Sequence, residues 1–140
     1  MNKNNEKALY DRFKTMYSGV DLPPTESLMC FGFECGDGWF NIIWNLSEEL
    51  EKLHPNIKAK QVKEKYGTLR FYIAGVPHEV FDDIYIAIDQ ATLLSAKTCE
   101  ECGAPGQLCH AGYWFRTLCP ECAKKSNYEA CPPEDDEEEQ

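Results

Sequence analysis

Apolar residues recur at helical spacing near the start of the chain. Within residues 5–17, Leu9, Phe13 and Met16 would share one face of a helix. The small polar pair at residues 18–19, serine followed by glycine, can end it. We therefore predict an amphipathic helix over residues 5–17.

A longer apolar stripe predicts a second helix. Asp37 is expected to cap its N-terminus, and the His-Pro pair at residues 54–55 ends it. Phe40 and Trp44 widen the apolar face, so we expect burial on more than one side. The stripe itself consists of Trp39, Ile43, Leu46, Leu50 and Leu53.

Apolar and polar residues then alternate over residues 58–74, which predicts a hairpin that turns near Gly67 and Thr68. The apolar positions are Val62 and Tyr66 on the first arm and Leu69, Phe71 and Ile73 on the second.

The helical period returns after the hairpin and predicts a third helix. Pro77 suits its first turn. We expect one face of this helix to point inward, through Phe81, Ile84, Ile88, Ala91 and Leu94.

This order of elements predicts an α+β fold in which helices pack on a small antiparallel hairpin or sheet. The expected divisions are an α+β domain over residues 1–98, a metal-binding module over residues 99–128 packed on it, and an acidic tail over residues 129–140.

Two Cys-x2-Cys motifs, separated by sixteen residues, carry the strongest chemical signal. Each motif presents two sulfurs on one side of a tight turn, and four soft donors are typical of a structural zinc site. With four protein ligands no coordination position stays open for water. The sequence therefore predicts one structural Zn²⁺ on Cys99, Cys102, Cys119 and Cys122, while an iron centre would use the same ligands.

The remaining cysteines give weaker signals. Cys109 or His110, which lie between the two motifs, could replace one ligand. Cys30 and Cys35 have apolar neighbours and are expected to be buried. The polar first twenty-two residues do not resemble a signal peptide, and no apolar run is long enough to span a membrane, so a cytoplasmic protein with reduced thiols is expected.

Charge restricts the choice of partner. The chain has 14 basic and 24 acidic residues and a formal net charge of −10. An unbroken acidic run at residues 134–139 predicts a disordered tail, which either keeps the protein in solution or seeks a basic surface.

Direct nucleic-acid binding is the alternative function. Residues 58–72 hold a cluster of basic side chains interleaved with Tyr66 and Tyr72, a combination that can follow a phosphate backbone and stack bases. The acidic character of the whole chain disfavours this alternative.

No pattern of an enzyme site stands out. The His-x-Glu element of zinc deaminases is absent, because His78 is followed directly by Glu79. The metalloprotease helix motif and a Gly-rich phosphate loop are also absent. We therefore expect a binding protein rather than an enzyme.

Four strings together carry a resemblance to a known family. They are residues 35–40 (CGDGWF), 62–72 (VKEKYGTLRFY), 99–106 (CEECGAPG) and 114–119 (WFRTLC). Over residues 35–122 the chain resembles a family of small, uncharacterised phage and prophage proteins. This resemblance implies a phage or prophage origin in a bacterial host, and no particular activity.

A small acidic protein with a metal module also resembles the metal-containing anti-CRISPR proteins that inhibit Cas9. That resemblance implies a basic, nucleic-acid-handling host protein as partner, such as Cas9 with its guide RNA. An acidic surface would then dock on the lobe that receives the target duplex and block the loading of DNA.

Overall fold

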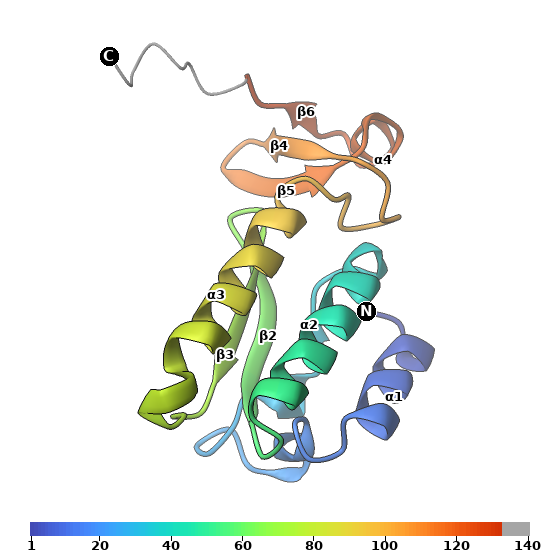
Figure 1. The fold of residues 1–140 in the computed structure, drawn as a ribbon. Coiled ribbons are helices and arrows are strands. Elements are labelled where there is room, and N and C mark those ends of the chain that lie inside the picture. Colours follow the sequence, from blue (N-terminus) through green and yellow to red (C-terminus); the bar gives the residue numbers. More distant parts are fainter. Residues whose placement is uncertain (133–140) are drawn as a thin grey trace, which may run out of the picture.

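The computed structural model describes residues 1–132, which form an α+β fold (Figure 1). Its helices are α1 (Lys3–Arg12), α2 (Phe40–Leu53), α3 (His78–Ser95) and α4 (Pro120–Lys125). Its strands are β1 (Phe33–Glu34), β2 (Ala59–Lys65), β3 (Thr68–Ile73), β4 (Gln107–Ala111), β5 (Trp114–Leu118) and β6 (Glu129–Ala130). No helix among residues 1–132 is long and apolar enough to cross a membrane.

The predicted hairpin is confirmed, and it forms most of the larger sheet. Strands β2 and β3 pair antiparallel, with Val62 opposite Phe71. Tyr66 and Gly67 form the turn, and both have positive φ values, 53° and 85°, as a tight two-residue hairpin turn requires. Tyr66 therefore lies in the turn and is exposed, not on the first arm as predicted.

Strand β1 completes this sheet by pairing parallel to β2, through Phe33 opposite Val62. This two-residue strand was not predicted from the sequence. Its register is set by long-range contacts, because a segment this short has no alternation that a sequence pattern can show.

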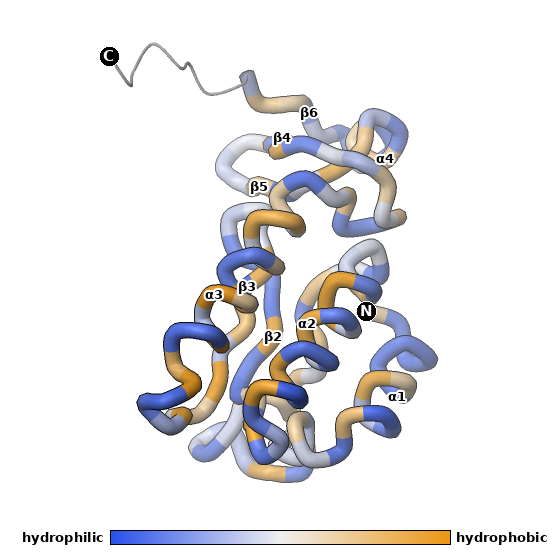
Figure 2. Tube along the Cα trace, viewed as in Figure 1, coloured by the Kyte–Doolittle hydropathy of each residue, from blue (hydrophilic) through white to orange (hydrophobic). Residues whose placement is uncertain are grey.

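Helices α2 and α3 cover one face of the β1-β2-β3 sheet (Figure 1). Apolar and polar residues follow one another every three to four positions along both helices, as in an amphipathic helix (Figure 2). The strands bury Val62, Leu69 and Phe71 toward the helices, while Lys63 and Tyr72 belong to the opposite face. Among residues 1–132 no helix lies on that opposite face, which is here called the open face.

Helix α1 ends earlier than predicted. The chain leaves helical geometry at Phe13, four residues before Tyr17. Met16 and Tyr17 are nonetheless buried, and the Tyr17 hydroxyl lies 2.6 Å from Oγ of Ser47 on α2. The apolar residues were therefore correctly assigned to the core, but tertiary contacts rather than helical propensity fix the backbone there.

Asp37 does not cap α2, contrary to the prediction. It lies in a 3-10 turn that precedes the helix, and α2 begins at Phe40 without a side-chain cap. The Asp37 carboxylate instead accepts hydrogen bonds from the backbone N–H of Asn2 at 2.7 Å and from Nδ2 of Asn5 at 3.1 Å. It thus stabilises the N-terminus of α1.

Two of the five inward positions predicted for α3 are wrong. Ile84, Ile88 and Ala91 are buried, but Phe81 and Leu94 are exposed. Only one side of α3 meets the sheet and α2, so the residues at the edges of its apolar stripe remain in solvent.

The C-terminal unit contains a second sheet with strand order β5-β4-β6. Strand β4 pairs with β5 along its length and with β6 through His110 opposite Glu129. Residues 129–131 therefore extend the module, although the sequence analysis assigned them to the tail. The acidic run at residues 134–139 lies outside the described residues.

Candidate metal centre

The first pair of cysteines follows directly from the end of α3. A backbone hydrogen bond from the N–H of Cys99 to the carbonyl of Ala104 measures 2.7 Å, and another from Gly103 to Cys99 measures 2.9 Å. These bonds fold residues 99–104 into a compact turn, so the sulfurs of Cys99 and Cys102 are held on one side of it.

The second pair lies where β5 gives way to α4. Cys119 is the N-cap of α4, and its Sγ accepts a hydrogen bond from the N–H of Cys122 at 3.4 Å. Pro120 occupies the first helical position, where a missing N–H costs nothing. A helical turn therefore directs the sulfurs of Cys119 and Cys122 to the same side.

The four predicted ligands come together. All four sulfur atoms lie within 4.8 Å of one another, and those of Cys102 and Cys119 are 3.6 Å apart. A tetrahedral ion with metal–sulfur bonds of about 2.3 Å requires sulfurs about 3.8 Å apart. The cluster can therefore hold a metal ion.

Burial and hydrogen bonding divide the four thiols. Cys99 and Cys119 are buried, Cys122 is half-buried and Cys102 is exposed. Burial raises the pKa of the Cys99 thiol, but backbone hydrogen bonds from Cys119, Cys102 and Glu101 outweigh burial and lower this pKa to about 7. Hydrogen bonding with Cys119 is the largest cause that raises the pKa of Cys122. Ionisation of Cys99 is thus favoured, which suits capture of a cation.

Neither Cys109 nor His110 belongs to this cluster. The Sγ of Cys109 points to the carbonyl of Gln107 at 3.3 Å, within the small apolar core of the module. Among residues 1–132 the cysteines form no disulfide. Cys35 is buried as predicted, and burial is the largest cause that raises its pKa to about 12, whereas Cys30 is exposed, contrary to the prediction.

The first cysteine turn packs directly on the segment before α2. The backbone N–H of Gly38 donates to the carbonyl of Glu100 at 2.7 Å, and Nε1 of the fully buried Trp39 donates to the carbonyl of Thr98 at 2.9 Å. A Cβ on Gly38 would lie 2.1 Å from the carbonyl oxygen of Cys99. Close backbone approach therefore requires glycine at this position.

Glu100 strengthens this contact from the other side. Its buried carboxylate accepts a hydrogen bond from the N–H of Gly36 at 2.9 Å. It also forms an ion pair with Nε of Arg116 at 3.4 Å. Burial raises the pKa of Glu100, and Arg116 opposes that effect. Sequence reasoning did not assign a role to Glu100, because an acidic residue inside a Cys-x2-Cys turn is ordinarily solvent-exposed.

The hairpin turn forms the second contact with the metal module. The hydroxyl of Thr117 on β5 donates to the carbonyl of Gly67 at 2.7 Å. A Cβ on Gly67 would approach a methyl group of Leu108 to 2.6 Å. The strings at residues 35–40, 62–72, 99–106 and 114–119 therefore meet around one junction between the two sheets.

Comparison with known proteins yields no relative. No protein-family model, no curated protein and no solved structure matches the chain.

Proposed function

We propose that the cysteine cluster holds one structural Zn²⁺ and that the protein acts by binding rather than by catalysis. Four thiolates complete a tetrahedral shell, which leaves no position for a substrate or a reactive water. The ion would stabilise the turns at residues 99–102 and 119–122 and, through Gly38 and Glu100, the junction with the larger sheet.

Substitution of the exposed ligand tests the zinc site. Cys102→Ser should remove most of the bound zinc and lower the melting temperature, although an exposed serine leaves no cavity. Cys30→Ser, also exposed but away from the cluster, is the matched control. Metal content measured by atomic emission should be one zinc per chain in wild type and control. An equal zinc content in wild type and the Cys102→Ser variant would contradict the proposal. Detection of iron instead of zinc in the wild-type protein would show that the site holds iron.

We further propose that α3 is a docking face for a basic protein. Its side away from the sheet alternates acidic and large apolar residues, with Asp82, Ile86, Asp89 and Leu93 in one stripe. The rings of Phe81 and Tyr85 contact each other beside this stripe, with centroids 4.6 Å apart and planes tilted by 42°.

This face has the composition expected of a protein interface. Helix α3 has four acidic residues and no lysine or arginine. Exposed apolar side chains at this density mark an interaction site, and the carboxylates select a partner of opposite charge. Ile86 and Leu93, both more than half exposed, would supply the apolar contact.

The partner that we propose is a basic, nucleic-acid-handling bacterial protein, with the Cas9–guide complex as the specific candidate. Docking of α3 on the lobe that receives target DNA would block loading. The observation that carries this proposal is the acidic and apolar stripe along the exposed side of α3.

A DNA-loading assay tests the proposed partner. Labelled target DNA, Cas9 and guide RNA are mixed with increasing amounts of the protein, and the effector-bound DNA is measured. We expect wild type to reduce loading and the variant Asp82→Lys/Asp89→Lys to lose at least about tenfold in potency.

The control for this assay is Asp21→Lys/Glu129→Lys, which makes the same change in charge at two exposed sites away from α3 and from the cysteine turns. It should inhibit as wild type does. No effect of the wild-type protein on loading would refute Cas9 as the partner, and equal loss in both variants would refute α3 as the docking face.

A further inference from the structure

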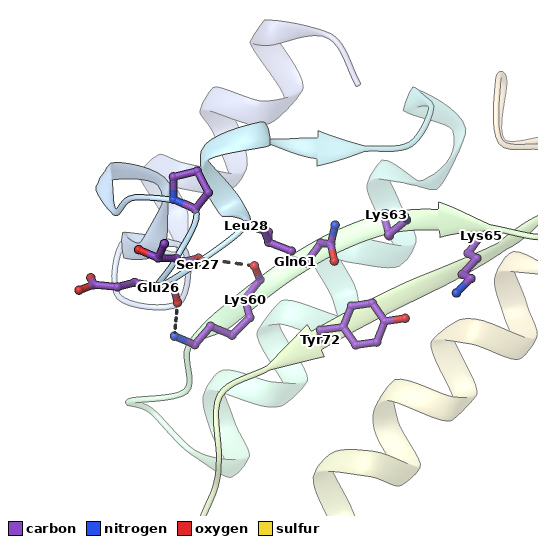
Figure 3. A pocket seen from close by; sticks show the side chains of 10 residues that line it. Glu26, Ser27, Leu28, Lys60, Gln61, Lys63, Lys65 and Tyr72 are labelled. Atoms are coloured by element: carbon purple, nitrogen blue, oxygen red, sulfur yellow. Dashed lines mark hydrogen bonds between the residues drawn. The ribbon is translucent and has the colours of Figure 1, made fainter.

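The open face of the larger sheet has a hollow with a cationic wall. The hollow measures about 430 Å³ and lies between β2, β3 and the loop at residues 24–28. Lys60 and Lys65 project into it from β2 and Tyr72 projects from β3, while Leu28 adds an apolar floor (Figure 3).

A second hollow continues from the first toward the metal module. It measures about 310 Å³ and is lined by Tyr66 of the hairpin turn and by Tyr113 and Trp114 of the β4–β5 turn. Lys63 and Lys65 line both hollows, so the two share one wall. We call the combined surface the lysine–aromatic track.

The cations along this track are free to meet an external anion. Among residues 1–132, Lys63 and Lys65 form no ion pair. Arg70 lies opposite Lys63 in the neighbouring strand. Its Nε atom is buried and has no hydrogen-bond partner among the same residues. Within the described part of the chain, Nζ of Lys60 donates to the backbone carbonyl of Glu26 at 2.7 Å and forms no ion pair.

Two of the carboxylates near the track already accept hydrogen bonds, whereas Glu26, which lines the first hollow, is exposed. Glu34 accepts a hydrogen bond from Gln61 at 3.2 Å, and Glu64 accepts one from the backbone N–H of Gly67 at 2.7 Å. The two hollows together are lined by three lysines and two glutamates, so the track has a local excess of positive charge, although the described residues carry more acidic than basic side chains.

The aromatic side chains are unusually exposed for a folded protein. The exposed fractions are 45% for Tyr72, 68% for Tyr66, 77% for Trp114 and 98% for Tyr113. Exposed aromatic rings beside free cations are the combination that holds single-stranded nucleic acid, in which bases stack on rings and phosphates meet ammonium groups. A duplex offers its phosphates but keeps its base faces stacked inside.

We infer that the lysine–aromatic track binds single-stranded nucleic acid, DNA or RNA, across the junction of the two sheets. Phosphates would lie against Lys60, Lys63 and Lys65. Bases would stack on Trp114 and on its neighbours Tyr66 and Tyr113. This surface is formed by other residues than the α3 face, so it is independent of the proposed protein partner.

Fluorescence anisotropy with labelled strands of about 12 nucleotides, a length within the site sizes of known single-strand grooves, tests the inference. The full-length, metal-loaded protein is titrated into mixed-sequence DNA and RNA single strands and into the matching duplex. We expect both single strands to bind more tightly than the duplex. A stronger RNA signal would indicate contacts to the 2′-hydroxyl, and equal signals would place recognition in bases and phosphates.

Salt dependence and charge reversal locate the site. With three phosphate contacts, the logarithm of the association constant should fall with the logarithm of the salt concentration with a slope of about −2. A fourfold rise in salt concentration should therefore weaken binding roughly 20-fold. Lys63→Glu/Lys65→Glu should abolish this binding. The matched control is Lys124→Glu/Lys125→Glu, two exposed lysines on α4 that do not line the track, which should retain most of it.

Tryptophan fluorescence provides a readout that charge alone would not change. Trp39 is fully buried and Trp44 half-buried, whereas Trp114 is exposed, so stacking of bases should quench Trp114 selectively. Trp114→Phe should remove the quenching while weakening anisotropy-detected binding only in part. Circular dichroism and zinc content check that each variant folds.

Three results would overturn the inference. They are no binding of either single strand by the wild-type protein, binding of the duplex with equal affinity, and equal loss of binding in the two lysine double variants. None of them bears on inhibition of DNA loading through α3, so the failure of either proposal is distinguishable from that of the other.

Discussion

At the scale of single residues, glycines decide how closely the metal module approaches the rest of the molecule. Gly36 and Gly38 both lie against the backbone of the first cysteine turn, with virtual Cβ atoms 2.3 Å and 2.1 Å from carbonyl oxygens of Glu100 and Cys99. Backbone atoms cannot rotate away as a flexible side chain can. The identity of these two residues therefore controls the junction more strictly than any apolar contact there.

Alanine at residue 38 tests this interpretation. Gly38→Ala should lower the free energy of unfolding by about 1–3 kcal/mol, since a methyl group must displace backbone. Gly75→Ala is the control, because a Cβ at Gly75 meets no atom within 4 Å. Urea unfolding followed by circular dichroism measures both. Similar stability of the two variants would mean that the junction adapts without cost.

At the scale of elements, the ends of α1 and α2 depend on each other. The Asp37 carboxylate, in the turn that leads into α2, accepts a hydrogen bond from the backbone N–H of Asn2 at the N-terminus of α1. The backbone hydrogen bond from Asn2 is the largest cause that lowers the pKa of Asp37, and the side chain of Asn5 adds to it. An acid with a lowered pKa in the folded state contributes stability above its unfolded pKa, and this contribution is lost as pH falls.

Asp37→Asn should therefore destabilise the protein at neutral pH, by an amount that shrinks as the pH is lowered through the pKa of folded Asp37. Thermal unfolding of wild type and variant at a series of pH values between neutral and acid measures this difference. Asp11→Asn is a useful comparison, because Lys7 lowers the pKa of Asp11 on the exposed side of α1 alone. A difference between wild type and Asp37→Asn that does not change with pH would exclude the charge as its cause.

At the scale of the whole molecule, charge is distributed unevenly over the surfaces. Helix α3 carries acidic residues on the side away from the sheet, whereas Lys60, Lys63 and Lys65 lie on the open face. A basic protein and a nucleic acid would therefore meet different sides. The six acids at residues 134–139 account for more than half of the net charge, because the other 14 basic and 18 acidic residues give −4.

Deletion of residues 134–140 should slow association with a basic partner at low salt and leave the dissociation rate nearly unchanged, since long-range attraction acts on encounter. Stopped-flow mixing with the Cas9–guide complex at low and high salt measures the effect, which should vanish at high salt. An association rate that the deletion does not alter at low salt would mean that the run only aids solubility.

The sequence alone determined the features that depend on short-range spacing. The cluster of four cysteines is the clearest example, because each Cys-x2-Cys turn places its sulfurs locally and only the two turns then need to meet. The tight turn before Thr68 and the inward residues Val62, Leu69 and Phe71 were predictable for the same reason, since a two-residue period is local.

Tertiary structure decided what depends on contacts between distant residues. Helix α1 ends at Arg12, and Tyr17 is buried against Ser47. The Asp37 carboxylate lies at the N-terminus of α1 instead of capping α2. The tertiary structure also brought Trp114 beside Lys65, in a hollow formed by residues about fifty positions apart. No periodicity records such contacts, because they depend on how elements pack and not on which residues are neighbours in the chain.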